Sequence, residues 1–272
     1  MHSKVDGRSV IKQSQVNILA ILYKYRFGSR QLISESLNKN PDTMYRNLLV
    51  LIKHGLINVR LEKRSKLYGI SAAYYLTPKG LRHLQSLPDY SFIDDSIIKG
   101  SYRDKSVSEN TVLHTFAVFQ QILALKRQYP TLKAFLRRDM ARFTYFPNTP
   151  PNAFLSLSDG ETTRRYFFEY VQDSQERKAF YQKVSAYIDY FDKGDWDVTG
   201  ADIPTLLFVA EKANTEYRIK RLIKGALSKL NPDVEIQILT TTKRAIEQID
   251  QQPVIWTSVD DPDELIALED AR

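Results

Sequence analysis

Residues 43–57 constrain this chain more strongly than any other stretch. They read Thr-Met-Tyr-Arg-Asn-Leu-Leu-Val-Leu-Ile-Lys-His-Gly-Leu-Ile. Apolar residues recur every three or four positions and predict one buried helix face, made of Met44, Leu48, Leu51 and Ile52. Asn40 is a candidate N-cap, Pro41 suits the first helical position, and Gly55 is placed to end the helix in the left-handed conformation. The stretch therefore predicts a helix with well-defined ends and a polar outer face.

The segments on either side of this helix complete a recognisable order. The expected elements are helices over 11–25 and 29–37 (the latter capped by Ser29), the helix within 43–57, strands over 56–61 and 68–76, and a closing helix that ends near 87. A basic tip, Glu62-Lys63-Arg64-Ser65-Lys66, joins the two strands. Three helices, a hairpin and a closing helix predict a winged helix-turn-helix domain over residues 1–87.

The positive charge of the chain is concentrated in the same region. The whole chain has 39 Lys and Arg against 32 Asp and Glu; residues 1–87 hold 15 against 4, and the remainder holds 24 against 28. Cations that neutralise phosphates release counterions, so a basic domain of this kind predicts double-stranded DNA as its partner. The side chains expected at the DNA are Arg26, Arg30, Thr43, Tyr45, Arg46, Asn47, Lys53, Arg60, Lys63, Arg64 and Lys66.

Two of these residues are candidates for recognising bases. Arg46 has the donors to bind a guanine edge in the major groove, and Asn47 has the donor and acceptor that match an adenine edge. The sequence leaves open which of them does so.

Composition bounds the rest of the chain. A length of 272 residues fits two domains, and the lack of cysteine excludes disulfides, cysteine-ligated zinc and thiol catalysis. No apolar run approaches the ~20 residues of a membrane helix, and the N-terminus lacks a signal-peptide layout, so we expect a soluble cytoplasmic protein with no membrane association. We expect a linker over 88–109, a second domain over 110–245 and a loose acidic tail over 246–272.

The second domain has its own order of elements. They are a helix over 110–129, strands over 141–146, 153–157 and 166–171, a helix over 174–191, a strand over 205–210, a helix over 215–230 and a strand over 234–239. This order resembles the restriction-endonuclease-like fold of the PD-(D/E)xK nucleases. The fold class expected for the whole chain is therefore α+β or α/β, a winged helix-turn-helix followed by an αβββαβ nuclease-like domain.

Several short motifs occur in a fixed order along both domains. They are Leu-Tyr-Lys-Tyr-Arg-Phe at 22–27, the helix of 43–57, Tyr-Tyr-Leu-Thr-Pro-Lys-Gly at 74–80, Leu113-His114, Ala117-Val118, Pro151-x-Ala153, Phe168-Glu169 and Lys183-x-x-x-Tyr187. A chain with these motifs resembles the replication-relaxation family, which includes the MobC-type relaxases of mobilisable plasmids. The resemblance implies binding at an origin of transfer or replication, other mobilisation or replication proteins as partners, and strand nicking in active members. A homodimer stays open.

The resemblance also implies where a nuclease site would lie. In PD-(D/E)xK enzymes an Asp opens the second core strand and a Glu-x-Lys lies on the third; the carboxylates hold Mg²⁺ and the lysine orients water. Glu169 matches the metal-binding carboxylate, but Asn152 and Val171 stand where the Asp and the Lys are expected. An amide is a weaker metal ligand than a carboxylate because it lacks the negative charge.

Substitutes for the missing groups lie nearby in the sequence. Asp139 or Asp173 is a candidate second carboxylate, and Lys183 on the next helix is a candidate migrated lysine. Lys183 and Tyr187, at i and i+4, share a helix face and could approach one phosphate. Each also has an ordinary structural role open to it, as a solvated lysine and a core tyrosine.

Three functions remain possible from the sequence. The first is a DNA-binding protein of plasmid mobilisation or replication with a degenerate nuclease-like domain and no certain cofactor. The second is an active Mg²⁺- or Mn²⁺-dependent relaxase that nicks one strand with Glu169, Lys183 and Asn152 at its catalytic site. The third is a winged-helix transcriptional repressor.

Overall fold

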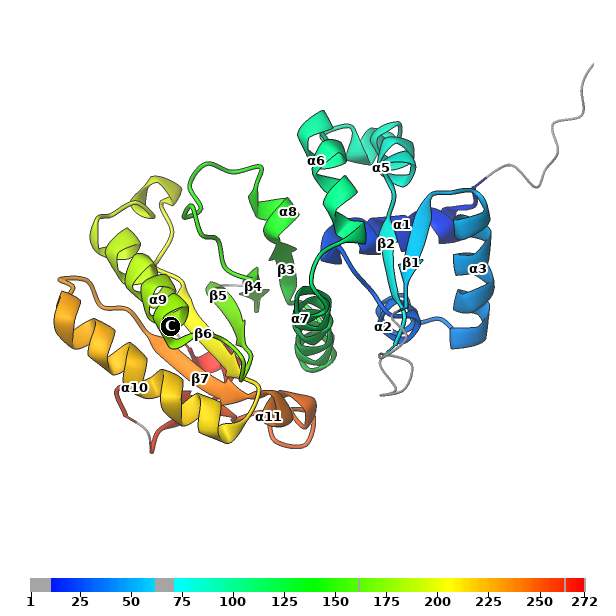
Figure 1. Cartoon of the computed structure of the whole chain (residues 1–272). Helices are drawn as coiled ribbons and strands as arrows, with labels where there is room; N and C mark the ends of the chain where they lie inside the picture. The colour runs from blue at the N-terminus through cyan, green and yellow to red at the C-terminus, as the bar shows by residue number, and fades with distance from the viewer. Residues whose placement is uncertain (1–10, 62–70, 161, 262, 272) are drawn as a thin grey trace, which may run out of the picture. The chain divides into compact units, whose positions relative to one another are not determined.

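The computed structural model describes residues 11–61, 71–160, 162–261 and 263–271 (Figure 1). The chain divides into two compact units, Met1–Phe119 and Gln120–Arg272. The boundary between them falls inside helix α7 (Glu109–Gln128). Both units mix helices with β-structure, as the expected α+β class requires. Within the described residues, none of the helices has the length and apolarity that crossing a bilayer requires.

The first unit has a small helical core and a two-stranded sheet. Its elements are α1 (Gln13–Tyr25), α2 (Arg30–Ser36), α3 (Pro41–Lys53), β1 (Ile57–Arg60), β2 (Ala73–Leu76), α5 (Pro78–Gln85), α6 (Asp95–Gly100) and the start of α7. β1 and β2 pair antiparallel, from Ile57 opposite Leu76 to Arg60 opposite Ala73. The basic tip predicted between them, with Lys63, Arg64 and Lys66, lies outside the described residues.

The helix ends predicted for the first unit are confirmed by their hydrogen bonds. The Ser29 hydroxyl accepts from the Leu32 amide at 3.2 Å and caps α2. The Asn40 side chain accepts from the Asp42 amide at 2.8 Å and caps α3. Gly55 follows α3 with a φ of +68°, the left-handed conformation expected there. Local signals thus fix both ends of α3.

Residues 88–109, predicted as an open linker, contain ordered helical turns. They form two 3₁₀ turns, Pro88–Tyr90 and Ser101–Lys105, on either side of α6. Ile93 and Ile98 from this segment are almost fully buried in the same apolar core as α1 and α3. Composition suggested a linker because the apolar residues are few, but those few are the ones that pack.

The second unit is built on a seven-stranded sheet whose spatial order follows the chain. Its strands are β3 (Lys133–Leu136), β4 (Ala153–Ser158), β5 (Thr163–Val171), β6 (Thr205–Ala210), β7 (Ile238–Thr242), β8 (Trp256–Ser258) and β9 (Leu265–Ile266). The three central strands β5, β6 and β7 run parallel, and all outer pairings are antiparallel. The sheet is therefore mixed.

Two helices provide the crossovers of the parallel strands. α9 (Arg177–Asp192) connects β5 to β6, and α10 (Ala213–Leu230) connects β6 to β7. Figure 1 shows them side by side over the sheet, and they contact each other closely. One core of buried aromatic and aliphatic side chains lies between helices and strands, with Phe167, Tyr187 and Phe208 among its largest members.

Two strand predictions for the second unit are wrong. Residues 141–146 form turns after the short helix α8 (Arg137–Met140), and the first strand is β3. The aromatic residues that suggested a strand pack into a ring cluster around Trp196 instead, with Tyr145 at 5.8 Å and Phe146 at 6.1 Å between centroids. The last predicted strand lies four residues too early at its start.

The C-terminal segment also departs from its prediction. Residues 246–272 were expected to be a loose acidic tail, but they supply β8 and β9. Trp256 and Leu268 are fully buried, and the Leu268 carbonyl accepts a hydrogen bond from the buried Tyr166 hydroxyl at 2.7 Å. The many acidic residues of this segment suggested a tail, but its few apolar residues form two short strands at one edge of the sheet.

Candidate functional site

The outer side of α3 carries exposed polar residues. Thr43, Arg46 and Lys53 are exposed, while Met44, Leu48 and Leu51 hold the opposite side in the core. Capping at both ends and burial of one face make α3 a firmly held helix. Its outer face can thus present donors in a fixed arrangement, as groove recognition requires.

Asn47 is less available than Arg46. Its Nδ2 donates to the Thr43 carbonyl at 3.0 Å, and its Oδ1 accepts from Gln15 Nε2 of α1 at 3.4 Å. The Arg46 side chain is exposed, and its Nη2 donates a 3.4 Å hydrogen bond to the Thr43 hydroxyl. Gln15 was not singled out from the sequence, although a polar residue on the apolar side of α1 was a signal for such a role.

Arg30 lies beside α3 through an aromatic contact. It is the first residue of α2 and is exposed, and its guanidinium is 5.7 Å from the centroid of the Tyr45 ring. Tyr45 is itself 44% exposed. The pair places a cation and an aromatic edge next to the outer face of α3.

Two arginines expected at the DNA are used inside the first unit. Arg26 forms an ion pair with the buried Asp104 carboxylate, with Nη2 at 2.8 Å. Arg60 Nη1 donates to the Val107 carbonyl at 2.8 Å and lies 3.4 Å from the Asp104 carbonyl. Both arginines therefore attach residues 101–107 to the rest of the unit.

The second unit brings together three of the residues that the nuclease pattern singled out. Glu169 lies on β5, where Phe167 and Val171 on either side of it belong to the core under α9. Its Oε1 pairs with Lys183 Nζ and accepts a 2.5 Å hydrogen bond from the Tyr187 hydroxyl, both from α9. The predicted grouping of Glu169 with Lys183 and Tyr187 is thus present in the structure.

Asn152 makes its hydrogen bond to the backbone of β5 and not to the side chains of this group. It directly precedes β4, and its Oδ1 accepts a 2.9 Å hydrogen bond from the Tyr170 amide. This bond ties the start of β4 to the residue that follows Glu169. An Asn can form it without bringing a second negative charge toward Glu169.

Burial makes the Glu169–Lys183–Tyr187 cluster strongly interdependent. The side chains of Glu169 and Lys183 are 6% and 17% exposed. Burial, together with the adjacent Glu169 carboxylate, raises the pKa of Tyr187 well above its usual value. The tyrosine therefore stays protonated as a donor, and the single carboxylate is matched by one ammonium and one hydroxyl.

The side chains of this cluster do not form a suitable set of ligands for a divalent metal ion. Mg²⁺ takes oxygen ligands in near-octahedral order, and protein sites for it normally supply carboxylates. Here Glu169 Oε1 already receives two donors. Asp139 accepts from the Leu136 amide at 2.9 Å, and Asp173 pairs with Lys212 at 2.5 Å. Among the described residues, no three His, Asp or Glu side chains gather in one place.

Comparison with known proteins gives one clear match. The family model described as "Replication-relaxation" matches residues 19–206. No curated protein matches the chain.

Two solved structures show limited likeness. A structure of restriction endonuclease FokI is 12% identical with a TM-score of 0.31, and one of FokI bound to DNA is 10% identical with a TM-score of 0.30. Each comparison covers 92% of this chain but 46% of the FokI chain, so the chain spans less than half of that protein's length. TM-scores this low do not establish a shared fold.

Proposed function

The chain belongs to the replication-relaxation family, and from that membership and the geometry of its first unit we propose that it is a DNA-binding protein of plasmid mobilisation or replication. The first unit acts as a winged helix-turn-helix, with α3 as its recognition helix. The second unit acts as a nuclease-like domain whose metal site is degenerate. Duplex DNA with an origin-type sequence is the proposed partner.

The exposed face of α3 carries this proposal. Arg46 and Lys53 lie on it, Arg30 lies beside it, and the region 1–87 has a net charge of +11. Exposed Leu49 and Val50 on α3 add apolar surface of the kind that contacts thymine methyl groups. Major-groove recognition typically uses a well-ordered helix that presents both hydrogen-bond donors and apolar side chains. Cations around such a helix bind the phosphates.

Arg46 is the residue that we assign to base recognition. Asn47 uses both ends of its amide within the protein, so we give it the role of orienting the first turn of α3. Thr43 and Tyr45 then border the base-reading position, and Lys53 and Arg30 bind phosphates. Arg60 is left out because it binds the carbonyls of residues 104 and 107.

The test begins by selecting a preferred site from random duplexes with the full chain. Competition gel shifts then compare that site with scrambled duplex. Arg46→Ala should reduce the preference about 5- to 150-fold, the equivalent of one lost bidentate base contact of about 1–3 kcal/mol. Arg82→Ala removes the same charge from an exposed position on α5 and should leave the preference unchanged. Equal preference in wild type and Arg46→Ala would contradict the assignment.

Metal-dependent nicking is a second candidate function. It is favoured by one observation: Lys183 reaches Glu169 from α9, which restores in space the glutamate–lysine pair that Val171 breaks in sequence. Under this alternative, wild type should convert supercoiled plasmid with the selected site to open circles in Mn²⁺, and Glu169→Ala should not. Under the degenerate-site proposal, the two proteins give equal background.

A further inference from the structure

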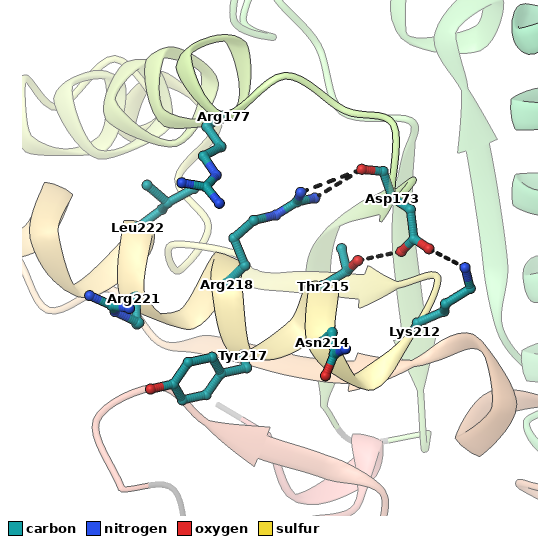
Figure 2. A pocket seen from close by; sticks show the side chains of 9 residues that line it. All are labelled: Asp173, Arg177, Lys212, Asn214, Thr215, Tyr217, Arg218, Arg221 and Leu222. Carbon is teal, nitrogen blue, oxygen red and sulfur yellow. Dashed lines mark hydrogen bonds and ion pairs between the residues drawn. The ribbon is translucent and has the colours of Figure 1, made fainter.

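The second unit contains a basic cavity that is separate from the Glu169–Lys183–Tyr187 cluster. It lies between the start of α9 and the first half of α10 and has a volume of about 710 Å³ (Figure 2). Its lining residues are Asp173, Arg177, Lys212, Asn214, Thr215, Tyr217, Arg218, Arg221 and Leu222. None of them belongs to the Glu169–Lys183–Tyr187 cluster. A cavity of this size is large enough for a nucleotide-sized ligand.

The lining is strongly cationic. Four of its side chains are positive, and Asp173 is the one carboxylate among them. Asp173 is already matched, because Lys212 pairs with it at 2.5 Å and the Thr215 hydroxyl donates to it. These hydrogen bonds, from Lys212 first, lower the pKa of Asp173, so it stays charged. Asp173 therefore offsets Lys212 and leaves the arginines uncompensated.

The arginines reach the cavity from two helices. Figure 2 shows Arg177 extending from α9 toward α10, and Arg218 extending toward the end of β5, where its guanidinium lies 3.4 Å from the Asp173 carbonyl. Arg177 and Arg221 have no carboxylate partner among the described residues. Three guanidinium groups around one hollow create a site that attracts an anion with several oxygens.

An aromatic side chain adjoins these cations. Tyr217 is 68% exposed, and the Arg221 guanidinium lies 5.9 Å from the centroid of its ring. Asn214, Tyr217, Arg218 and Arg221 follow one another at i, i+3, i+4 and i+7 and so line a single face of α10. A basic groove with an exposed aromatic ring is the arrangement on which single-stranded nucleic acids bind, with phosphates on the cations and bases on the ring.

We propose that this cavity binds single-stranded DNA, with Arg177, Arg218 and Arg221 on its phosphates and a base stacked on Tyr217. A base must be unpaired to stack on a side chain in this way, which favours a single strand over a duplex. The proposal rests on the DNA-related function proposed above, but it involves none of the residues assigned to α3.

The test measures binding of the full chain to a fluorescent oligothymidine of about 12 nucleotides, a length within the range of single-strand sites. Arg218→Ala with Arg221→Ala should weaken binding at least about tenfold. The double variant should also reduce the slope of log K against log salt by about 1.4, as expected for two lost phosphate contacts. Lys224→Ala with Lys229→Ala removes equal charge from exposed positions of the same helix outside the cavity, and it should bind like wild type.

Tyr217 gives an independent readout of stacking. Tyr217→Ala should weaken binding about tenfold without changing the salt slope, whereas Tyr217→Phe should bind like wild type. Equal loss in the cavity variant and the lysine control would show a diffuse charge effect and overturn the proposal. Inorganic phosphate that binds the cavity while the oligonucleotide does not would overturn it as well.

The same variants separate this proposal from the function of α3. Arg46→Ala should lose preference for the selected duplex and keep full affinity for the oligothymidine, and the cavity variant should show the reverse. Wild type that binds duplex but no single strand contradicts the cavity proposal alone. Wild type that binds single strands but no duplex contradicts the assignment of α3 alone.

Discussion

At the scale of single residues, the surroundings of Glu169 support the proposal that the second unit has a degenerate metal site. The Glu169 carboxylate is buried and is balanced by the Lys183 ammonium and the Tyr187 hydroxyl. A buried ion pair of this kind adds little net stability, but loss of one partner leaves an uncompensated charge in the core. We therefore expect the cluster to have a structural role, and removal of either partner of Glu169 should lower the free energy of unfolding.

Replacement of Lys183 tests this structural role. Lys183→Met should lower the free energy of unfolding by roughly 3–5 kcal/mol in urea titrations, because Glu169 stays buried without a counter-charge. Lys193→Met, at the residue directly after the same helix, breaks an exposed pair with Asp189 and should leave the free energy of unfolding almost unchanged. Equal stability of the two variants would mean that Glu169 does not depend on Lys183.

The raised pKa of Tyr187 predicts how the stability of the protein depends on pH. Its pKa is raised in the folded state, so its contribution is fully present below the unfolded value of about 10 and is lost as pH rises toward the folded value. The stability difference between wild type and Tyr187→Phe should therefore shrink above about pH 10. Unfolding titrations of both proteins across that range measure it. A difference that stays constant would contradict the raised pKa.

Single residues differed in how far the sequence could place them. The i, i+4 spacing placed Lys183 and Tyr187 on one helix face, and the resemblance to PD-(D/E)xK nucleases singled out Glu169, which the structure brings into contact with both. The roles of Arg26 and Arg60 depend on residues 104 and 107, which are distant in the chain, so a count of charges assigned them to DNA. Likewise the cavity needs Arg177 and Arg218 to converge from two helices.

Helices and strands were predictable where their signals are local. α3 combines a capping Asn40, Pro41 and a terminal Gly55 with an apolar period, and all were confirmed. β8 and β9 are only three and two residues long, and they exist because they pair with an established sheet edge. No local pattern signals such pairing, so the sequence suggested a tail.

Gly80 shows how closely one element can depend on another. It lies in the first turn of α5, and a Cβ at this position would stand 2.0 Å from the Leu56 carbonyl oxygen. Gly80→Ala should therefore force α5 away from the start of β1 and lower the free energy of unfolding by about 1–3 kcal/mol or more. Chemical denaturation provides the measurement.

A matched glycine supplies the control for that experiment. Gly225 lies inside α10 with nothing within 4 Å of an added Cβ. Gly225→Ala should raise stability by roughly 0.5–1 kcal/mol, because alanine loses less backbone entropy in a helix. A neutral or stabilising Gly80→Ala would show that α5 can shift without cost.

At the scale of the whole molecule, we propose DNA contacts for each unit on different grounds. The first unit is basic overall, with 15 Lys and Arg against 4 Asp and Glu in residues 1–87, while the remainder is mildly acidic. The second unit nevertheless concentrates arginines around one cavity on α9 and α10. Net charge along the sequence suggests the first proposed contact, whereas the second proposed contact depends on the folded arrangement of α9 and α10.

The central claim is that this protein recognises duplex DNA without cutting it. The most direct test is footprinting of an end-labelled duplex that contains the selected site, in the presence of Mn²⁺. Each reaction is run once with added nuclease and once without it. The account predicts protection of the site with nuclease and an intact strand without it. No protection at all, or a break that wild type makes and Glu169→Ala does not, would contradict it.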